Sequence, residues 1–349
     1  MRWRIFRGRC ASIMALFALA CASQAASGQT IEGAGATFPA PIYRQWFARF
    51  QQETGISVNY QAIGSGAGYN AIKARTVDFG ASDAPLSAAE EAAMPGPVVH
   101  IPTVGGAVVL SYNLPGIGTG LRFTPEIIAG IYLGHIKSWN DPKIVAANPG
   151  VRLPNLPVHP VHRTDGSGTT YIFTHYLRKA NGEWASSVGA GKSVSWPVGL
   201  GGKGNDGVAA VVRRTAGAIG YVELAYAREN HLAYGQIRNR AGNFVSPSVE
   251  STTAAIGKYI GQLRKDIKTP TVDAPGVNSY PICSLTYIIL YTNGGRNTAG
   301  ATKLWSWAMQ PTQQAMAKAL YYAPLPEALA RINLAHLRSV RGAQVIGSR

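Results

Sequence analysis

Short strands rich in β-branched residues alternate with amphipathic helices along this chain, and no other feature limits its fold as strongly. The runs Ile56–Tyr60, Val77–Ser82 and Val104–Tyr112 each predict a strand. Pro41–Thr54 predicts a helix, because Pro stands in its first turn and Gly55 follows its end. Further helices are expected at Thr124–Leu133, Tyr171–Lys179, Asp206–Arg213, Thr298–Met309 and Thr312–Leu320. This alternation is typical of the α/β class, and 349 residues are enough for two lobes.

The composition is that of a folded chain with an anionic partner. Hydrophobic residues make up 46% and charged residues 14%, which excludes a disordered chain and a long coiled coil. Lys and Arg number 33 against 17 Asp and Glu, so the formal charge is +16, which favours an anionic partner of some kind. The basic and aromatic residues form no nucleic-acid-binding module, so nucleic acid is not expected as a partner.

The first 25 residues have the layout of a secretory signal peptide. Four Arg precede an apolar run from Cys10 to Ala22, and small residues follow it. We expect cleavage after Ala25, export to the periplasm, and a charge of +12 once those four Arg are removed. A lipid anchor on Cys21 is the alternative, disfavoured because the preceding Leu lies one place too late for a lipoprotein processing site.

The remaining sequence offers little for redox or metal chemistry. Cys283 is the only Cys outside the signal peptide, so we expect no disulfide and a small core residue rather than a nucleophile. His159 and His162 stand three apart in a predicted strand and should point to opposite faces, so no metal site and no cofactor are expected. No later segment is apolar for long enough to cross a membrane, so we expect the mature chain to be soluble.

Three turns rich in Gly, Ser and Thr lead directly into helices. They are Gly33–Phe38, Gly64–Gly68 and Asp165–Thr169. The start of a helix has unpaired N–H groups and a partial positive charge, and hydroxyls at Thr37, Ser65, Ser167 and Thr169 add donors. Each turn alone could be an ordinary helix cap. Three of them in an exported basic chain favour an oxyanion-binding site.

The same turns carry a resemblance to a known family. The chain resembles the periplasmic phosphate-binding proteins of bacterial high-affinity phosphate ABC importers, which are solute-binding proteins. The similarity extends from about Gly33 to Leu325. The matching runs are Gly33–Pro41, Val77–Leu86, Ile131–Trp139, Arg163–Thr169, Trp196–Gly207 and Gly217–Glu223.

The resemblance implies a two-lobed periplasmic-binding-protein fold of type II. Each lobe would hold a central β-sheet flanked by helices, and two crossings, at Thr103–Gly105 and near Ile282–Ser284, would act as hinges. The implied organisation is a signal peptide (1–25), lobe one (26–103 and 284–349) and lobe two (104–283).

The resemblance also implies a ligand site between the lobes. Its phosphate-binding residues would be Thr37, Phe38, Ser65, Asp83, Arg163, Ser167, Gly168 and Thr169. Phe38 would donate through its backbone, Asp83 would be an acceptor, and Asp165 would pair with and orient the charged donor Arg163. The chain has His162 and Thr164 where the family commonly has Arg and Ala, so a role for the missing Arg neighbour is in doubt.

The chemistry of these residues fits a protonated oxyanion. The guanidinium of Arg163 is a rigid fork that matches phosphate geometry. An ionised Asp83 only accepts hydrogen bonds, so it tolerates a ligand that still carries a proton, as phosphate does near neutral pH and sulfate does not. The alternative role for Asp83 is to cap the helix that follows Pro85.

The expected function is therefore transport rather than catalysis. A monomer would bind inorganic phosphate and deliver it to the permease and ATPase subunits of a phosphate ABC importer. A binding protein for another oxyanion is one alternative. A secreted phosphohydrolase is another, but it would need a nucleophile with a base, or a metal cluster, and the sequence offers neither.

Overall fold

The structure is a computed structural model that describes residues 30–346, so the predicted signal peptide and Cys21 lie outside the described residues. Its strands form a mixed sheet with the order β2-β1-β3-β12-β4-β8-β6-β7, to which β9 adds by pairing with β4, and a small second sheet ordered β11-β10-β5. The strands are β1 (Ile31–Gly35), β2 (Val58–Ala62), β3 (Phe79–Ser82), β4 (Val98–Tyr112), β5 (Arg122–Phe123), β6 (His159–Arg163), β7 (Leu200–Gly202), β8 (Ala218–Glu223), β9 (Ala233–Tyr234), β10 (Gln236–Arg238), β11 (Phe244–Val245) and β12 (Cys283–Tyr291).

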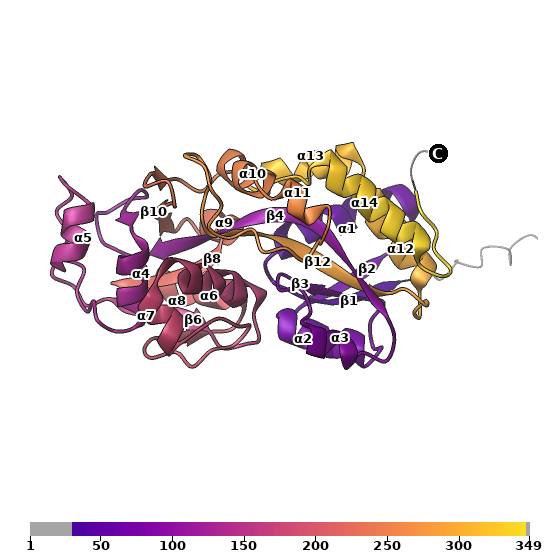
Figure 1. The fold of residues 1–349 in the computed structure, drawn as a ribbon, viewed down its shortest axis with the longest axis horizontal. Helices are drawn as coiled ribbons and strands as arrows, with labels where there is room; N and C mark the ends of the chain where they lie inside the picture. Colours follow the sequence, from indigo (N-terminus) through magenta and orange to yellow (C-terminus); the bar gives the residue numbers. More distant parts are fainter. Residues whose placement is uncertain (1–29, 347–349) are drawn as a thin grey trace, which may run out of the picture.

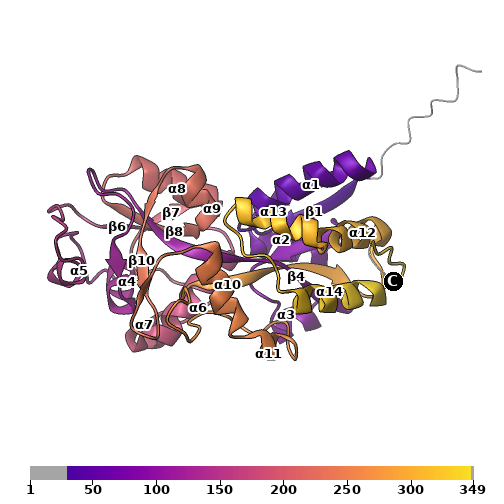
Figure 2. The ribbon, with the colours of Figure 1, turned by 90° about the horizontal axis from the view of Figure 1, so that it is seen from above.

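The molecule has two lobes, each built on one half of the large sheet (Figures 1 and 2). Lobe one contains β2, β1, β3 and β12, and lobe two contains β8, β6 and β7. The helices are α1 (Ala40–Thr54), α2 (Ser65–Lys73), α3 (Ala88–Ala92), α4 (Pro125–Tyr132), α5 (Pro142–Ala147), α6 (Gly168–Ala180), α7 (Gly182–Ser187), α8 (Gly204–Arg214), α9 (Leu224–Glu229), α10 (Val249–Gly257), α11 (Ile260–Leu263), α12 (Thr298–Ala308), α13 (Pro311–Ala319) and α14 (Glu327–Ser339). Helices α1–α3 and α12–α14 surround lobe one, and α4 and α6–α9 surround lobe two. This arrangement confirms the predicted α/β, two-lobed fold.

Strand β4 belongs to both lobes. It pairs antiparallel with β12 from Val98 to Ala107, and its last five residues, from Val108 to Tyr112, pair with β8. The predicted strand began six residues too late, because Pro102 has no N–H and normally interrupts a central strand. Here a β-bulge accommodates it, since the pairing with β12 skips Thr103.

The other predicted elements are present with small shifts in their ends. Helix α1 begins at Ala40 and ends before Gly55, whose φ of +72° is the left-handed conformation that stops a helix. Helix α6 begins at Gly168, three residues earlier than predicted, because Ser167 caps it. The strands predicted at Ile56–Tyr60 and Val77–Ser82 appear as β2 and β3.

Each lobe has its own aromatic cluster within the core. In lobe one, Tyr43, Phe79 and Trp305 pack with ring centroids about 5 Å apart. In lobe two, the stacked rings of Phe173 and Tyr221 lie 4.4 Å apart. Separate clusters of this kind let each lobe remain rigid on its own.

Cys283 is fully buried at the start of β12, and burial raises the pKa of its thiol to about 12. The predicted role as a small core residue is confirmed. None of the helices between residues 30 and 346 is long and apolar enough to cross a membrane.

Candidate functional site

The loop between β1 and α1 carries Thr37 and Phe38 to the junction of the lobes. At Gly35, whose φ is +149°, this loop passes very close to Ala81. A Cβ on residue 35 would lie only 2.0 Å from the carbonyl oxygen of Ala81, so glycine is required there. The carbonyl of Thr37 accepts a hydrogen bond from Tyr226 Oη at 2.6 Å, and that of Phe38 accepts one from Tyr322 Oη at 2.6 Å. The N–H of Phe38 has no partner among the described residues.

The second turn, at Gly64–Gly68, contacts lobe two directly. The N–H of Gly66 donates to the carbonyl of Gly166 at 2.8 Å. Ser65 Oγ accepts hydrogen bonds from the N–H of Gly168 at 3.0 Å and of Asp83 at 3.4 Å. The second and third Gly-rich turns therefore meet face to face.

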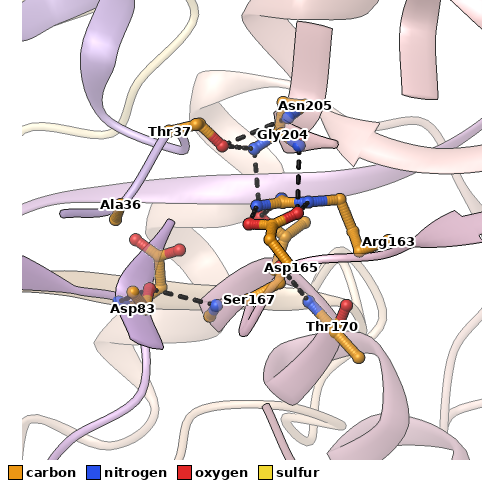
Figure 3. A network of polar contacts seen from close by, with 12 residues as sticks. Ala36, Thr37, Asp83, Arg163, Asp165, Ser167, Thr170, Gly204 and Asn205 are labelled. Carbon is orange, nitrogen blue, oxygen red and sulfur yellow. Dashed lines mark hydrogen bonds and ion pairs between the residues drawn. The ribbon is translucent and has the colours of Figure 1, made fainter. Parts of the chain in front are cut away.

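Arg163 lies at the carboxyl end of β6 and is only 4% exposed. Its Nε and Nη2 donate to the two oxygens of Asp165 at 2.7 and 2.5 Å, a bidentate pair, and Nη1 donates to Thr169 Oγ1 at 3.3 Å (Figure 3). The N–H of Gly204 adds a bond to Asp165 at 3.0 Å. Burial pushes the pKa of Asp165 upward, but the hydrogen bonds and charge of Arg163 outweigh it, and the net pKa lies below its usual value.

The third turn supplies the start of α6. Ser167 caps the helix, with its Oγ accepting from the N–H of Thr170 at 3.0 Å. Gly168 faces Asp83 across the junction so closely that a Cβ would lie 2.5 Å from Asp83 Oδ2. Only glycine fits this position, which explains the Gly in the motif.

Asp83 follows β3 and is 1% exposed, and it forms no ion pair with any residue between 30 and 346. Its Oδ1 accepts a hydrogen bond from Thr286 Oγ1 at 2.7 Å, and Thr286 lies in β12 opposite the β-bulge of β4. Burial raises the pKa of Asp83 to about 7, although the Thr286 bond and the charge of Arg163 oppose the shift. The capping alternative is wrong, because Ser87 caps the helix after Pro85 with a capping box.

The structure thus brings all nine predicted residues together, from both lobes. They are Thr37, Phe38, Ser65, Asp83, Arg163, Asp165, Ser167, Gly168 and Thr169. Of the departures from the family pattern, His162 stacks its ring on Trp196, with centroids 5.0 Å apart.

Sequence reasoning missed three residues of this network. Asn205 contacts both Thr37 and Thr169, Thr286 holds Asp83, and Tyr221 Oη accepts from the N–H of Arg163 at 3.0 Å. Asn205 lies within the matching run Trp196–Gly207 and Tyr221 within Gly217–Glu223, which were the available signals. Thr286 and Tyr221 lie in buried strands, where sequence alone does not separate a polar partner from a core residue.

Ion pairs join the lobes nearer the surface. Lys192 of lobe two pairs with Glu90 of α3, and Arg44 Nη2 of α1 lies 3.8 Å from Glu229 Oε2 of α9. We call these the rim pairs. Side chains in the rim pairs are 20–63% exposed, unlike the site residues. Burial pushes the pKa of Glu90 upward, but Lys192 outweighs it, and the net pKa is lowered. Between residues 30 and 346, no group of three or more His, Cys, Asp or Glu could hold a metal ion.

Comparison with known proteins places this chain among binding proteins. A family model described as a PBP superfamily domain matches residues 21–312. The phosphate-binding protein PstS of Pasteurella multocida is 44% identical over 302 residues, which cover 86% of this chain and 87% of that protein. PstS of Haemophilus influenzae is 44% identical over 304 residues, covering 86% of this chain and 90% of the relative.

Solved structures show the same fold. A high-affinity periplasmic phosphate-binding protein bound with phosphate aligns with a TM-score of 0.70 at 22% identity, over 88% of this chain and 93% of that one. A phosphate-binding protein from Stenotrophomonas maltophilia aligns with a TM-score of 0.66 at 19% identity, over 90% of this chain and 96% of that one. From the sequence relatives and this shared architecture, the chain belongs to the PstS family of phosphate-binding proteins within the PBP superfamily.

Proposed function

We propose that this chain binds one inorganic phosphate between its lobes and delivers it to a phosphate ABC importer. One observation carries the proposal: hydroxyls from both lobes form one buried network beside the Arg163 guanidinium, which donates to Thr169, while Asn205 links Thr169 to Thr37. Hydrogen bonds to a charged ligand contribute roughly 1.5–3 kcal/mol each, so a handful of them hold an anion firmly. The name and 44% identity of the relatives support the same function.

In the proposed site, Arg163 is the charged donor and Asp165 holds its guanidinium in place. Thr37, Ser65 and Thr169 donate through their hydroxyls, and Phe38 donates through its backbone N–H. Ser167 and Gly168 complete the donor set at the start of α6. Most of these donors are neutral, so the ligand is held without a large excess of positive charge and is released when the lobes open.

Asp83 sets the protonation state of the ligand in this proposal. As a carboxylate it accepts the proton that phosphate carries and repels an anion without one. Its deep burial and lack of an ion pair make that repulsion strong, because nearby charges interact more strongly in a medium of low dielectric.

We propose lobe boundaries at the predicted crossings, with lobe one at 26–103 and 284–349 and lobe two at 104–283. The change of partner along β4, between Ala107 and Val108, supports a crossing close to the first of these, and the start of β12 at Cys283 supports the second. Small-angle scattering should show compaction on adding phosphate, and an unchanged profile at saturation would count against hinge closure.

Within this proposal the protein works in the periplasm as a monomer without catalysis, and its partners are the permease and ATPase subunits. Titration calorimetry with phosphate, sulfate and arsenate tests the ligand. Binding of phosphate with no heat from sulfate supports the proposal, and a preference for sulfate would replace it with another oxyanion. Release of phosphate from a phosphomonoester would indicate the hydrolase alternative.

A further inference from the structure

Asn205 is the first polar side chain of α8 and is completely buried between the two lobes. Its Oδ1 accepts a hydrogen bond from the N–H of Glu223 at 2.8 Å. Because a backbone N–H can only donate, this bond fixes which end of the amide is oxygen. The Nδ2 group must therefore face the other way, toward the ligand site.

On that side, the amide contacts one hydroxyl from each lobe. Nδ2 donates to Thr37 Oγ1 of lobe one at 2.8 Å (Figure 3). It also donates to Thr169 Oγ1 of lobe two at 3.1 Å. The backbone N–H of Asn205 also donates to Thr37 Oγ1, at 3.1 Å. Both Nδ2 hydrogens of Asn205 are thus used, and its Oδ1 accepts from Glu223.

The consequence follows from counting hydrogen bonds at the two hydroxyls. A threonine hydroxyl has two lone pairs that accept and one hydrogen that it donates. Thr37 Oγ1 accepts two bonds from Asn205, and Thr169 Oγ1 accepts one from Asn205 and one from Arg163 Nη1. Both lone pairs of each oxygen are filled, and no described residue accepts either hydrogen.

We infer that Asn205 is a positioning residue that fixes the direction of the Thr37 and Thr169 hydroxyls, so that both can only donate to the ligand. This inference rests on the proposed phosphate function. The site then has one side, at Thr37 and Thr169, that only donates hydrogen bonds to the ligand, and another side, at Asp83, that accepts one from it. The proton of the ligand is therefore steered to the oxygen next to Asp83.

Ser65 shows that the same device exists elsewhere in the site. Its Oγ accepts from two backbone N–H groups, those of Gly168 and Asp83, and its hydrogen is likewise free to donate. At Ser65 the direction of the hydroxyl is fixed by backbone N–H donors, which no side-chain substitution at Gly168 or Asp83 removes. At Thr37 and Thr169 a side chain fixes it, and mutation can test it.

The test is Asn205→Asp, which keeps the acceptor for Glu223 and replaces the donor group by an acceptor oxygen. Both threonine hydrogens should then turn toward the new carboxylate, and phosphate affinity should fall about 100-fold or more. Parent protein is titrated in parallel: if it does not bind phosphate, the proposed function fails. If the parent binds and Asn205→Asp binds within 3-fold of it, this inference is overturned instead.

A double-mutant cycle with Thr37→Val separates direction from simple contact. The repulsion of the new charge is the same in both backgrounds and cancels. The quantity compared is the fold loss of phosphate affinity caused by Asn205→Asp. If Asn205 sets the direction of the hydroxyl, this loss is at least 10-fold smaller in the Thr37→Val background than in the parent. If Asn205 merely joins the lobes, its carboxylate still bonds Thr37, and the cost is equal or greater in the Val background, which overturns the inference.

Two further variants guard against a folding artefact. Asn239 is also a buried Asn of this chain, 4% exposed, whose Nδ2 donates to the carbonyls of Gly276, Val277 and Ser279. Asn239→Asp should lower thermal stability and leave phosphate affinity unchanged. Should Asn205→Asp not fold, Asn205→Ala removes the donors without adding charge. It should weaken binding about 10-fold, and binding within 2-fold of the parent overturns the inference.

Discussion

The lobes meet in two regions that differ in chemistry. The inner region holds buried hydrogen bonds between mostly neutral groups, such as Gly168 to Ser65 and Asn205 to Thr37. At the outer region, the rim pairs join charged side chains that water reaches. Exposed ion pairs typically contribute about 0–1 kcal/mol, whereas a buried polar group that loses its partner costs roughly 1–3 kcal/mol. Ligand recognition should therefore depend on the inner region, and the rim should modulate closure and its response to salt.

Arg163→Ala should give the largest effect, because it removes the charged donor from the inner region. Phosphate affinity should fall by at least ~1.5–3 kcal/mol, which is about 10- to 150-fold. The loss of Arg163 also leaves the partly buried carboxylate of Asp165 with backbone N–H partners such as Gly204 and no cation, so thermal stability should fall as well. Calorimetric titration measures the first effect and thermal melting the second.

Arg44→Ala is the matched control, since it removes an Arg that faces Glu229 at the rim. It should change phosphate affinity less than 3-fold. If the two Arg variants weaken binding equally, the distinction between inner region and rim is lost, and with it the assignment of Arg163 as the charged donor.

Asp83→Asn should change selectivity more than affinity. The amide can both accept and donate, and it removes a charge that opposes the anion. Phosphate should still bind, and sulfate should become a detectable competitor, with at least a 10-fold gain in its affinity. Competition calorimetry measures this. Continued exclusion of sulfate by Asp83→Asn would remove Asp83 from the selectivity mechanism.

The pH dependence of stability sharpens the same comparison. The pKa of Asp83 is raised from 3.8 to about 7 by burial, so ionising it costs stability in the folded, ligand-free protein. That cost is absent below about pH 4, grows as the pH rises, and is complete above about pH 7. At pH 8, the unfolding free energy of Asp83→Asn should therefore exceed that of the parent by up to about 4 kcal/mol, and its melting temperature should be higher. At pH 4 the two proteins should have nearly the same melting temperature. A difference that is the same at both pH values would contradict the assignment.

Lys192→Ala should give the smallest effect, because it removes one rim pair. Glu90 is the wrong partner to change, since it also belongs to the capping box of α3. Phosphate affinity should fall about 2- to 5-fold at low salt, and the difference should shrink at 0.5 M salt through screening. Lys143→Ala, which removes an exposed charge on α5, is the control for net charge and should show neither change.

The sequence predicted six of the fourteen helices between residues 30 and 346, and it named nine residues that the structure brings to one junction, for different reasons. The helices followed from apolar spacing and from local stop signals such as Gly55. The site residues followed from the turns and from the family resemblance, because short Gly-rich motifs keep their order along the chain. The contacts of Asn205, Thr286 and Tyr221 were not predicted, since they join segments 18 to 203 residues apart. The full length of β4 was missed because a bulge, which has no sequence signature here, accommodates Pro102.

Strand β4 also limits how this protein can vary in length. Side chains in a strand alternate between faces at every residue, so one added residue inverts all those beyond it. An insertion between Ala107 and Val108 would turn the side chains of Val108–Tyr112 to the opposite face of the sheet while leaving those that pair with β12 unchanged. One lobe would then present its core residues on the wrong side. Evolution can lengthen the loops of either lobe separately, but a residue added to β4 must be absorbed by a bulge, as Thr103 is, because this strand fixes which side chains of one lobe face the same side as those of the other.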